Sequence, residues 1–284
     1  MKQLMEYKII SGRTVEIRRS YMTVRSANDP QPRRAARRAG TSSEKKIKAN
    51  EDSCVKELAR VINSTFGEGD LFCALKYNNE RLPESYEEAE RDLDLHFLRQ
   101  LRREFRSRFE RLPKMVWVTA NWNPKHQVPA RLHHHLVIEA AAEPLIAKLW
   151  QGGGLNLEFL DNRGDHTDLA AYLVGNVHGI ERKAKWHASR NVSRPIYTEP
   201  VPVRDIEDVQ PEKGCVIRAH EAKADEDGHV TSSYLRCVLP EGERLALRGG
   251  KLVRTKGKKP PHPSAARTAS PPRGKHRKGG GGAK

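Results

Sequence analysis

The strongest constraint on the fold is an amphipathic helix near the middle of the chain. Ser85 and Glu88 have the spacing of a capping box, in which each side chain satisfies a backbone N–H of the first helical turn. Apolar residues then recur at three- and four-residue intervals from Leu93 to Leu112, and Pro113 ends the pattern. A helix with one apolar stripe must bury that stripe, so a second layer of structure has to pack against it.

Short strands on both sides of this helix define the fold class. Residues 71–77, 115–121, 131–139 and 155–160 have the length and apolar content of strands, and a further helix is expected from about Thr167. The order of these elements predicts an α+β domain, with a central antiparallel or mixed sheet and helices packed on one face.

The charge of the chain is high and unevenly distributed. The formal net charge is +16, and residues 251–284 hold 11 Lys and Arg but no acid. We expect this end to be a disordered basic tail, since it has too few apolar residues to form a core. Its charge suits a nucleic-acid partner bound through phosphate groups, without specifying a sequence.

Changes in composition divide the chain into four parts. We expect a basic N-terminal segment with short strands and a helix at 1–66, and the main α+β domain at 67–198. A small β-rich extension at 199–247 follows, with a hairpin around Asp225–Gly228, and the disordered tail occupies 248–284.

Cysteine usage and hydropathy exclude several classes of protein. The four cysteines are scattered and form no C-x-x-C pair, which argues against a zinc knuckle or a disulfide framework and fits a reducing cytoplasm. No stretch approaches 18 apolar residues, and the first residues lack the apolar core of a signal peptide. We therefore expect a cytoplasmic protein with no membrane partner.

The strand RLHHHLVIE at 131–139 carries the candidate metal site. Alternate side chains of a strand share a face, so His133 and His135 lie side by side while His134 points into the apolar side. Two imidazoles about 7 Å apart at the backbone can share one divalent ion and leave positions open for phosphate oxygens. The structural alternative is the polar end of an edge strand. Glu139 lies too far along the strand to join both histidines.

The helix DLAAYLVGNV, from Asp168 to Val177, carries the candidate nucleophile. Leu169, Leu173 and neighbouring residues form its apolar face, whereas Tyr172 falls on the opposite side. A tyrosine attacks phosphate only when its proton is removed and the phosphate charge is neutralised, which a neighbouring metal ion can do. The structural alternative is a tyrosine at the rim of the core.

Several motifs in this order resemble the HUH endonucleases, and more closely the replication initiators of filamentous phages and related plasmids. The resemblance runs from about Leu71 to Pro195. It rests on LFCALKYNNERLPES, RLHHHLVIE, DLAAYLVGN and KWHASRNVSRP, with weaker similarity in YKIISGRTVEIRRS and LARVINSTFGEGD. It identifies 67–198 as an HUH endonuclease domain.

The resemblance implies rolling-circle replication initiated on single-stranded origin DNA, encoded by a phage or plasmid in a bacterial cell. His133 and His135 would bind Mg²⁺ or Mn²⁺, and Tyr172 would attack a phosphodiester. The products are a 5′-phosphotyrosine link and a free 3′-hydroxyl, and the host's replicative helicase and polymerase are further implied partners.

Two positions depart from the family pattern. An acidic third ligand is common at the end of the neighbouring strand, where this chain has Ala120 and Asn121, and we take Asn121 as the substitute ligand. A lysine is common one turn after the tyrosine, where Gly175 and Asn176 stand. Basic residues of the following segment and of the N-terminal arm are expected to bind DNA, the former supplying a substitute lysine. They are Lys183, Lys185, Arg190 and Arg194, and Arg33, Arg34, Arg37 and Arg38.

Two other interpretations remain open. A transposase or plasmid-mobilisation relaxase would use the same metal and tyrosine chemistry. A DNA-binding module that recognises an origin without cutting it would explain the missing acid at 120–121, although it leaves the retained histidines and tyrosine without a purpose.

Overall fold

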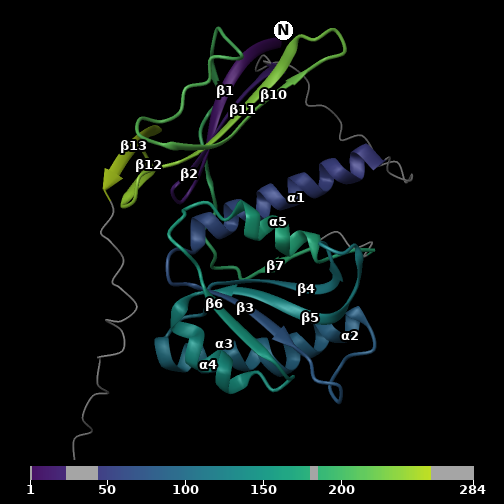
Figure 1. Cartoon of the computed structure of the whole chain (residues 1–284). Coiled ribbons are helices and arrows are strands. Elements are labelled where there is room, and N and C mark those ends of the chain that lie inside the picture. Colours follow the sequence, from purple (N-terminus) through teal and green to yellow (C-terminus); the bar gives the residue numbers. More distant parts are fainter. Residues whose placement is uncertain (1, 24–43, 180–184, 257–284) are drawn as a thin grey trace, which may run out of the picture.

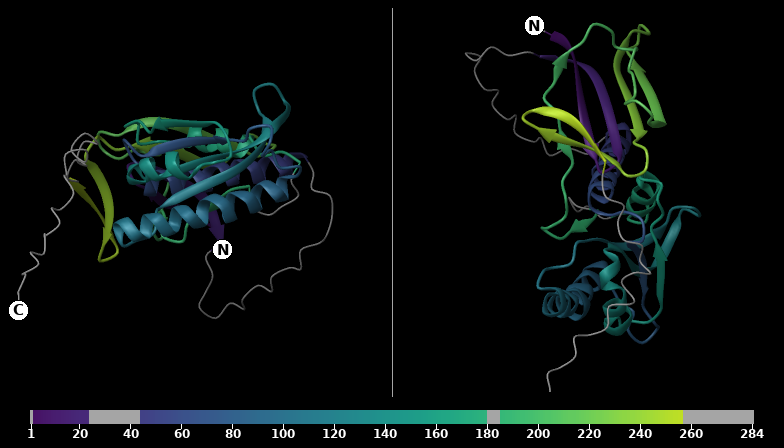
Figure 2. Two further views of the ribbon diagram at one scale, coloured as in Figure 1. Left: turned by 90° about the horizontal axis from the view of Figure 1, so that it is seen from below. Right: turned by 90° about the vertical axis from the view of Figure 1, so that its left-hand side faces the viewer.

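A computed structural model describes residues 2–23, 44–179 and 185–256, with the backbone alone at 44–47 (Figure 1). These residues form two large antiparallel sheets at opposite ends of the molecule, with two helices between them (Figure 2). The expectation of an α+β protein with antiparallel sheets is confirmed. Within these ranges, no helix combines the length and the hydropathy that crossing a bilayer requires.

The first sheet, which we call the histidine sheet, contains the strands predicted around the central helix. Its strand order is β6-β3-β5-β4-β7, and every neighbouring pair is antiparallel. The strands are β3 (Leu71–Lys76), β4 (Met115–Asn123), β5 (Val128–Ile138), β6 (Leu155–Phe159) and β7 (His187–Ala188).

Helices cover both faces of the histidine sheet, so the expectation of helices on one face is wrong. One face packs on α2 (Tyr86–Asp92), α3 (Arg99–Phe109) and α4 (Glu143–Leu149), with the short η2 (Ala140–Ala142) beside them. The other face packs on α1 (Glu44–Thr65) and α5 (Thr167–Gly175). Strands β3, β4 and β5 carry apolar residues on both faces, which is the pattern of strands buried between two layers.

The predicted central helix is continuous from α2 to α3 but contains an irregularity. Ser85 is the N-cap and accepts a hydrogen bond from the Glu88 N–H at 3.1 Å, as predicted, while the Glu88 carboxylate accepts one from the Glu84 N–H. Between α2 and α3, the segment η1 (Leu93–Leu98) is π-helical. The wider turn shifts the apolar stripe but keeps Leu93, Phe97 and Leu98 buried.

The second sheet, which we call the accessory sheet, pairs strands from the beginning of the described chain with strands from near its end. Its order is β10-β11-β2-β1-β8, and β9 also pairs with β1. The strands are β1 (Lys2–Ser11), β2 (Thr14–Thr23), β8 (Ile196–Tyr197), β9 (Val201–Pro202), β10 (Val216–Ala224) and β11 (Val230–Val238). The hairpin predicted around Asp225–Gly228 is thus confirmed as β10 and β11.

A separate hairpin, β12 (Glu243–Arg248) with β13 (Lys251–Lys256), extends into the segment expected to be disordered. The expectation of disorder is therefore wrong for 248–256, where Leu252 packs on the apolar cluster of the accessory sheet. Residues 257–284, the remainder of the expected tail, lie outside the described residues.

Candidate active site

The two candidate metal-binding histidines lie on the α1–α5 side of the histidine sheet. Antiparallel pairing places His133 opposite Lys76 of β3 and Ala120 of β4, and His135 opposite Ala74 and Val118. Residues that face each other across antiparallel strands share a side of the sheet. The predicted register is therefore the observed one.

The imidazoles converge through their Nε2 atoms. The Nε2 atoms of His133 and His135 are 3.1 Å apart. The His133 Nδ1 lies 2.8 Å from the Arg131 carbonyl oxygen, which only accepts, so Nδ1 carries the proton and Nε2 keeps a lone pair. The His135 ring stacks on Phe72 with centroids 5.3 Å apart, and its Nδ1 has no partner among the described residues.

Both imidazoles are held neutral, the protonation state that a metal ligand requires. Burial lowers the pKa of His135 to about 3, with repulsion from His133 and Lys76 as lesser causes. Burial likewise lowers the pKa of His133, and Lys76 adds to this effect, although the Arg131 carbonyl opposes it. A neutral imidazole keeps one nitrogen lone pair, which His133 directs through Nε2 and which His135 directs through Nε2 when its proton lies on Nδ1.

Tyr172 projects from α5 toward this pair. Its phenolic oxygen is 3.4 Å from the His135 Nε2, and its ring meets those of His135 and Phe72 edge to face. The side chain is 44% exposed, so a substrate can reach the oxygen. Ala170, Leu173 and Val174 of the same helix are buried in the layer between α1 and the sheet, as the helical periodicity predicts.

The N-terminal end of α5 is held by a buried polar network. The Asp165 Oδ1 accepts hydrogen bonds from the Thr167 N–H at 3.1 Å and the Thr167 hydroxyl at 2.6 Å, which places a carboxylate at the start of the helix. Arg236 of β11 contacts the other Asp165 oxygen at 3.1 Å and donates to the Thr167 hydroxyl at 2.9 Å. Asn63 of α1 accepts from the His166 N–H at 2.8 Å. The accessory sheet therefore sets the position of the tyrosine helix.

The C-terminal end of α5 is held by asparagines. The Asn176 carbonyl oxygen accepts from the N–H groups of Asn121 and Trp122 on β4, at 3.0 and 3.1 Å. The Asn121 side chain donates to the His178 carbonyl at 2.9 Å and accepts from the His178 N–H at 3.0 Å. Asn121 thus anchors the segment after α5, and its amide is committed there instead of to the histidine pair.

His134 lies in the core on the opposite face, as predicted, but its ring is fully hydrogen-bonded. Its Nε2 is 2.8 Å from the Tyr77 hydroxyl, which donates to Asp92 at 2.9 Å, and its Nδ1 is 3.1 Å from the Thr119 hydroxyl. Since the Tyr77 proton goes to Asp92, His134 donates through Nε2 and accepts through Nδ1. Burial lowers its pKa to about 3, so this histidine is a neutral structural residue.

The predicted DNA-binding residues fall into three groups. The Lys185 ammonium pairs with Glu51 of α1 at 2.6 Å, so it is not free to act beside Tyr172. Arg190 and Arg194 are exposed on the segment around β7 and β8. The others lie outside the described residues: Lys183, Arg33, Arg34, Arg37 and Arg38.

The donor set fits a divalent ion with two protein nitrogens. Ligands about 2.1 Å from a common ion and at right angles to each other lie about 3 Å apart, close to the separation of the two Nε2 atoms. Among the described residues, no carboxylate, cysteine or third histidine places a ligand atom within 4.8 Å of both nitrogens. The one such three-residue group in those ranges is the exposed turn Asp225, Asp227 and His229, where Asp225 caps backbone N–H groups of the β10–β11 turn.

Sequence reasoning missed one feature beside the histidines and one at the C-terminal end of α5. Lys76 is exposed at the end of β3 directly opposite His133, and its charge acts on both imidazoles. Trp122 stacks on His178 with centroids 4.3 Å apart, beside the C-terminal end of α5. The predicted strand at 71–77 contains Lys76, but only the pairing of this strand with β5 places Lys76 beside His133.

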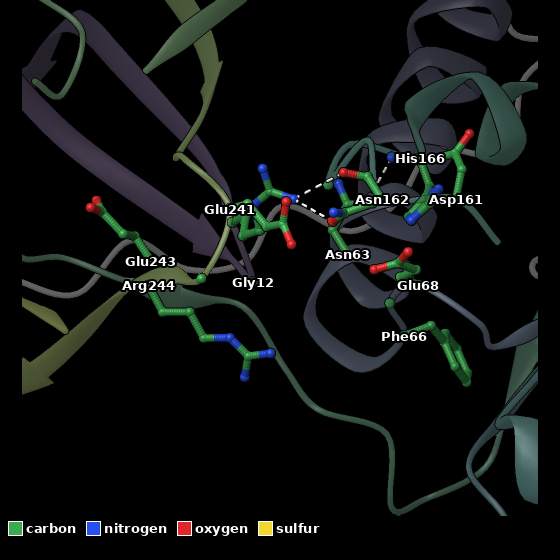
Figure 3. A pocket seen from close by; sticks show the side chains of 14 residues that line it. Gly12, Asn63, Phe66, Glu68, Asp161, Asn162, His166, Glu241, Glu243 and Arg244 are labelled. Carbon is green, nitrogen blue, oxygen red and sulfur yellow. Dashed lines mark hydrogen bonds between the residues drawn. The ribbon is translucent and has the colours of Figure 1, made fainter. Parts of the chain in front are cut away.

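A cavity among the described residues lies elsewhere (Figure 3). It has a volume of about 110 Å³ and lies between the β1–β2 turn, the end of α1 and the loop before α5, near Asn63 and His166. Neither His133, His135 nor Tyr172 lines it.

Comparisons of the chain with protein-family models, with curated proteins and with solved structures yield no match.

Proposed function

We propose that this protein is a metal-dependent endonuclease that nicks single-stranded DNA with Tyr172, as the rolling-circle replication initiators do. One observation carries the proposal. The Tyr172 oxygen lies 3.4 Å from the His135 Nε2, which in turn lies 3.1 Å from the His133 Nε2. The sequence pattern selects these same three residues on grounds that do not involve their contact in space.

Each residue of the site has a separate role in the proposed reaction. His133 and His135 would hold Mg²⁺ or Mn²⁺, which when bound neutralises phosphate charge and favours the tyrosinate. Tyr172 is presented from a helix fixed at both ends, so its oxygen approaches from one direction. Lys76, exposed beside His133, supplies positive charge to an incoming phosphate.

The chemical step exchanges one phosphate ester for another. The Tyr172 oxygen bonds to phosphorus while the bond from phosphorus to the DNA O3′ breaks. The phenolic proton leaves to solvent, and the departing O3′ takes up a proton, so the step needs no external energy source. The same exchange in reverse, with a 3′-hydroxyl attacking the phosphotyrosine, rejoins a strand.

A second candidate has one observation in its favour. The described residues offer no acidic third ligand, which is what a DNA-binding protein that no longer cuts would show. The exposed Tyr172 side chain beside two neutral imidazoles favours the enzyme, because origin binding alone requires neither of the two contacts among these residues.

The deciding experiment looks for a covalent adduct. Protein is mixed with Mn²⁺ and a pool of random-sequence single-stranded oligonucleotides, and adducts are separated in denaturant. We expect a shifted band whose peptide map places the nucleotide on Tyr172, and Tyr172→Phe abolishes it. Tyr197→Phe is the matched control, since Tyr197 is also exposed but lies on the accessory sheet. DNA binding with no adduct at any Mn²⁺ concentration would establish the non-cutting alternative.

A further inference from the structure

A second cleft, of about 140 Å³, opens between α1 and the accessory sheet. One row of side chains crosses the sheet there, because Glu221 of β10 faces Tyr234 of β11, which faces Arg18 of β2, which faces Tyr7 of β1. Lys56 approaches from α1 and lies over the Tyr234 ring, with Nζ 4.6 Å from its centroid. The volume exceeds what a few water molecules need, so the cleft has room for a larger polar group.

Two residues that line the cleft carry buried hydrogen-bond donors that lack acceptors. The Tyr234 hydroxyl and the Arg18 Nε are buried and have no partner among the described residues. Burial raises the pKa of the Tyr234 phenol, so it stays protonated and can donate. A buried donor left unpaired costs about 1–3 kcal/mol, a penalty that is removed when the side chain turns toward an acceptor bound in the cleft.

The charge around these donors is positive. Arg18, Lys56 and Lys223 line the cleft, against the single carboxylate of Glu221. Arg18 also touches Glu16 at 3.3 Å, but Glu16 is neutralised by Arg60, which contacts its two oxygens at 2.6 Å each. A group that offers several acceptors and negative charge, and no donors, matches this lining. Phosphate has that chemistry.

We infer that the cleft between α1 and the accessory sheet binds a backbone phosphate of single-stranded DNA, away from the bond that is cut. The identity of the polymer rests on the proposed function, whereas the phosphate chemistry rests on the cleft itself. The opposite side of α1 packs toward the tyrosine helix, since Leu58 and Ile62 are buried with Leu173 of α5, whereas Lys56 contacts the accessory sheet. One helix diameter, about 10–12 Å, therefore separates the two regions. An extended strand a few nucleotides long bridges such a gap.

The test compares two charge reversals on the same helix. Fluorescein-labelled (dT)20 is titrated with protein without metal, and anisotropy is followed from low to moderate salt. We expect Lys56→Glu to weaken binding about tenfold and to flatten the plot of log affinity against log salt by about 0.7, the share of one phosphate on a single strand. Lys48→Glu makes the same charge change at an exposed position of α1 outside the cleft and should cost much less.

Two further variants keep the proposal open to refutation if Lys56→Glu fails to fold. Tyr234→Phe removes only the donor hydroxyl, and Lys223→Glu acts from β10. Both are expected to weaken binding, whereas Tyr197→Phe, at an exposed position outside the cleft, leaves the affinity unchanged. Equal losses from Lys56→Glu and Lys48→Glu, or full affinity in both Tyr234→Phe and Lys223→Glu, would overturn the assignment. Absence of a covalent adduct would count against the proposed nicking activity and not against the cleft.

Discussion

The phenolic oxygen of Tyr172 lies 3.4 Å from the Nε2 of His135, although the two residues belong to different layers of the domain. Tyr172 comes from a helix packed on the sheet, and His135 from the central strand of that sheet. Their approach depends on how α5 is held, because a small rotation of the helix moves the oxygen away. The anchors at the two ends of α5 therefore belong to the site as much as the reacting groups do.

Removing either imidazole should abolish metal-dependent cutting. His133→Ala and His135→Ala each leave one nitrogen ligand, so we expect Mn²⁺ affinity to fall at least tenfold. Isothermal titration with Mn²⁺ measures this directly, and circular dichroism checks that the fold persists. Metal binding of normal strength in both variants would contradict the site.

Arg236→Ala should slow adduct formation by Tyr172, although Arg236 does not contact that tyrosine. The substitution leaves the buried Asp165 carboxylate without its cation, which we expect to cost about 3 kcal/mol of unfolding free energy and to loosen the start of α5. Hydrogen exchange should rise in residues 167–172, and the single-turnover rate of adduct formation should fall while Mn²⁺ affinity stays constant. Arg254→Ala, which removes an ion pair on the β12–β13 hairpin, is the control. An unchanged adduct rate in Arg236→Ala would show that α5 needs no such support.

Asn121→Asp tests whether the missing acid can simply be restored. The amide of Asn121 donates to the His178 carbonyl, and a carboxylate cannot. We expect the variant to lose about 1–2 kcal/mol of stability and to gain no Mn²⁺ affinity. Tighter Mn²⁺ binding would mean that the side chain turns toward the histidines and acts as the third ligand.

His134→Leu should lower stability and leave the chemistry of the folded protein intact. Leucine suits the apolar surroundings but leaves the Thr119 hydroxyl without its acceptor and Tyr77 without one of its two partners. We expect a loss of about 2 kcal/mol in urea unfolding and a normal adduct rate for the folded fraction. Loss of cutting by a folded variant would mean that the register of β5 is misassigned.

The same histidine makes the metal-free protein sensitive to acid. Unfolded His134 takes up a proton near pH 6.5, whereas in the folded protein its pKa is about 3. The stability that neutral His134 contributes to the folded protein is therefore fully present above pH 6.5. It is lost as the pH falls toward 3, at up to about 1.4 kcal/mol per pH unit. Urea unfolding in EDTA between pH 7 and 4 should show a shallower decline for His134→Leu than for the unchanged protein.

Local periodicity was enough to predict the strands β3, β4, β5 and β6 of the histidine sheet, though not the short β7, and the faces of β5 and α5. The alternation in LHHHLVIE separates His134 from its two neighbours, and the helical spacing separates Tyr172 from Leu173. Such patterns depend only on residues a few positions apart. The number of helical layers depends on contacts between distant segments, so the sequence did not place α1 on the second face of the sheet.

Contacts between distant segments account for what the sequence could not indicate. Arg236 reaches Asp165 only because β11 pairs with β2, and Lys76 faces His133 only because β3 pairs with β5. Asn121 looked like a ligand because of its place at the end of β4, but the irregular pairing between Ala120 and Trp122 turns it toward His178. One sequence does not show strand pairing or bulges of this kind.

The pairing of Ser20 with Ser232 has a consequence for synthesis on the ribosome. The strands of the histidine sheet leave the ribosome long before β11. They can therefore pair with one another while β11 is still to be made. The first hairpin, β1 with β2, is made before all of them and waits for β11 with an open hydrogen-bonding edge. Because Arg236 lies on β11, α5 acquires this anchor only after every strand of the histidine sheet has been made.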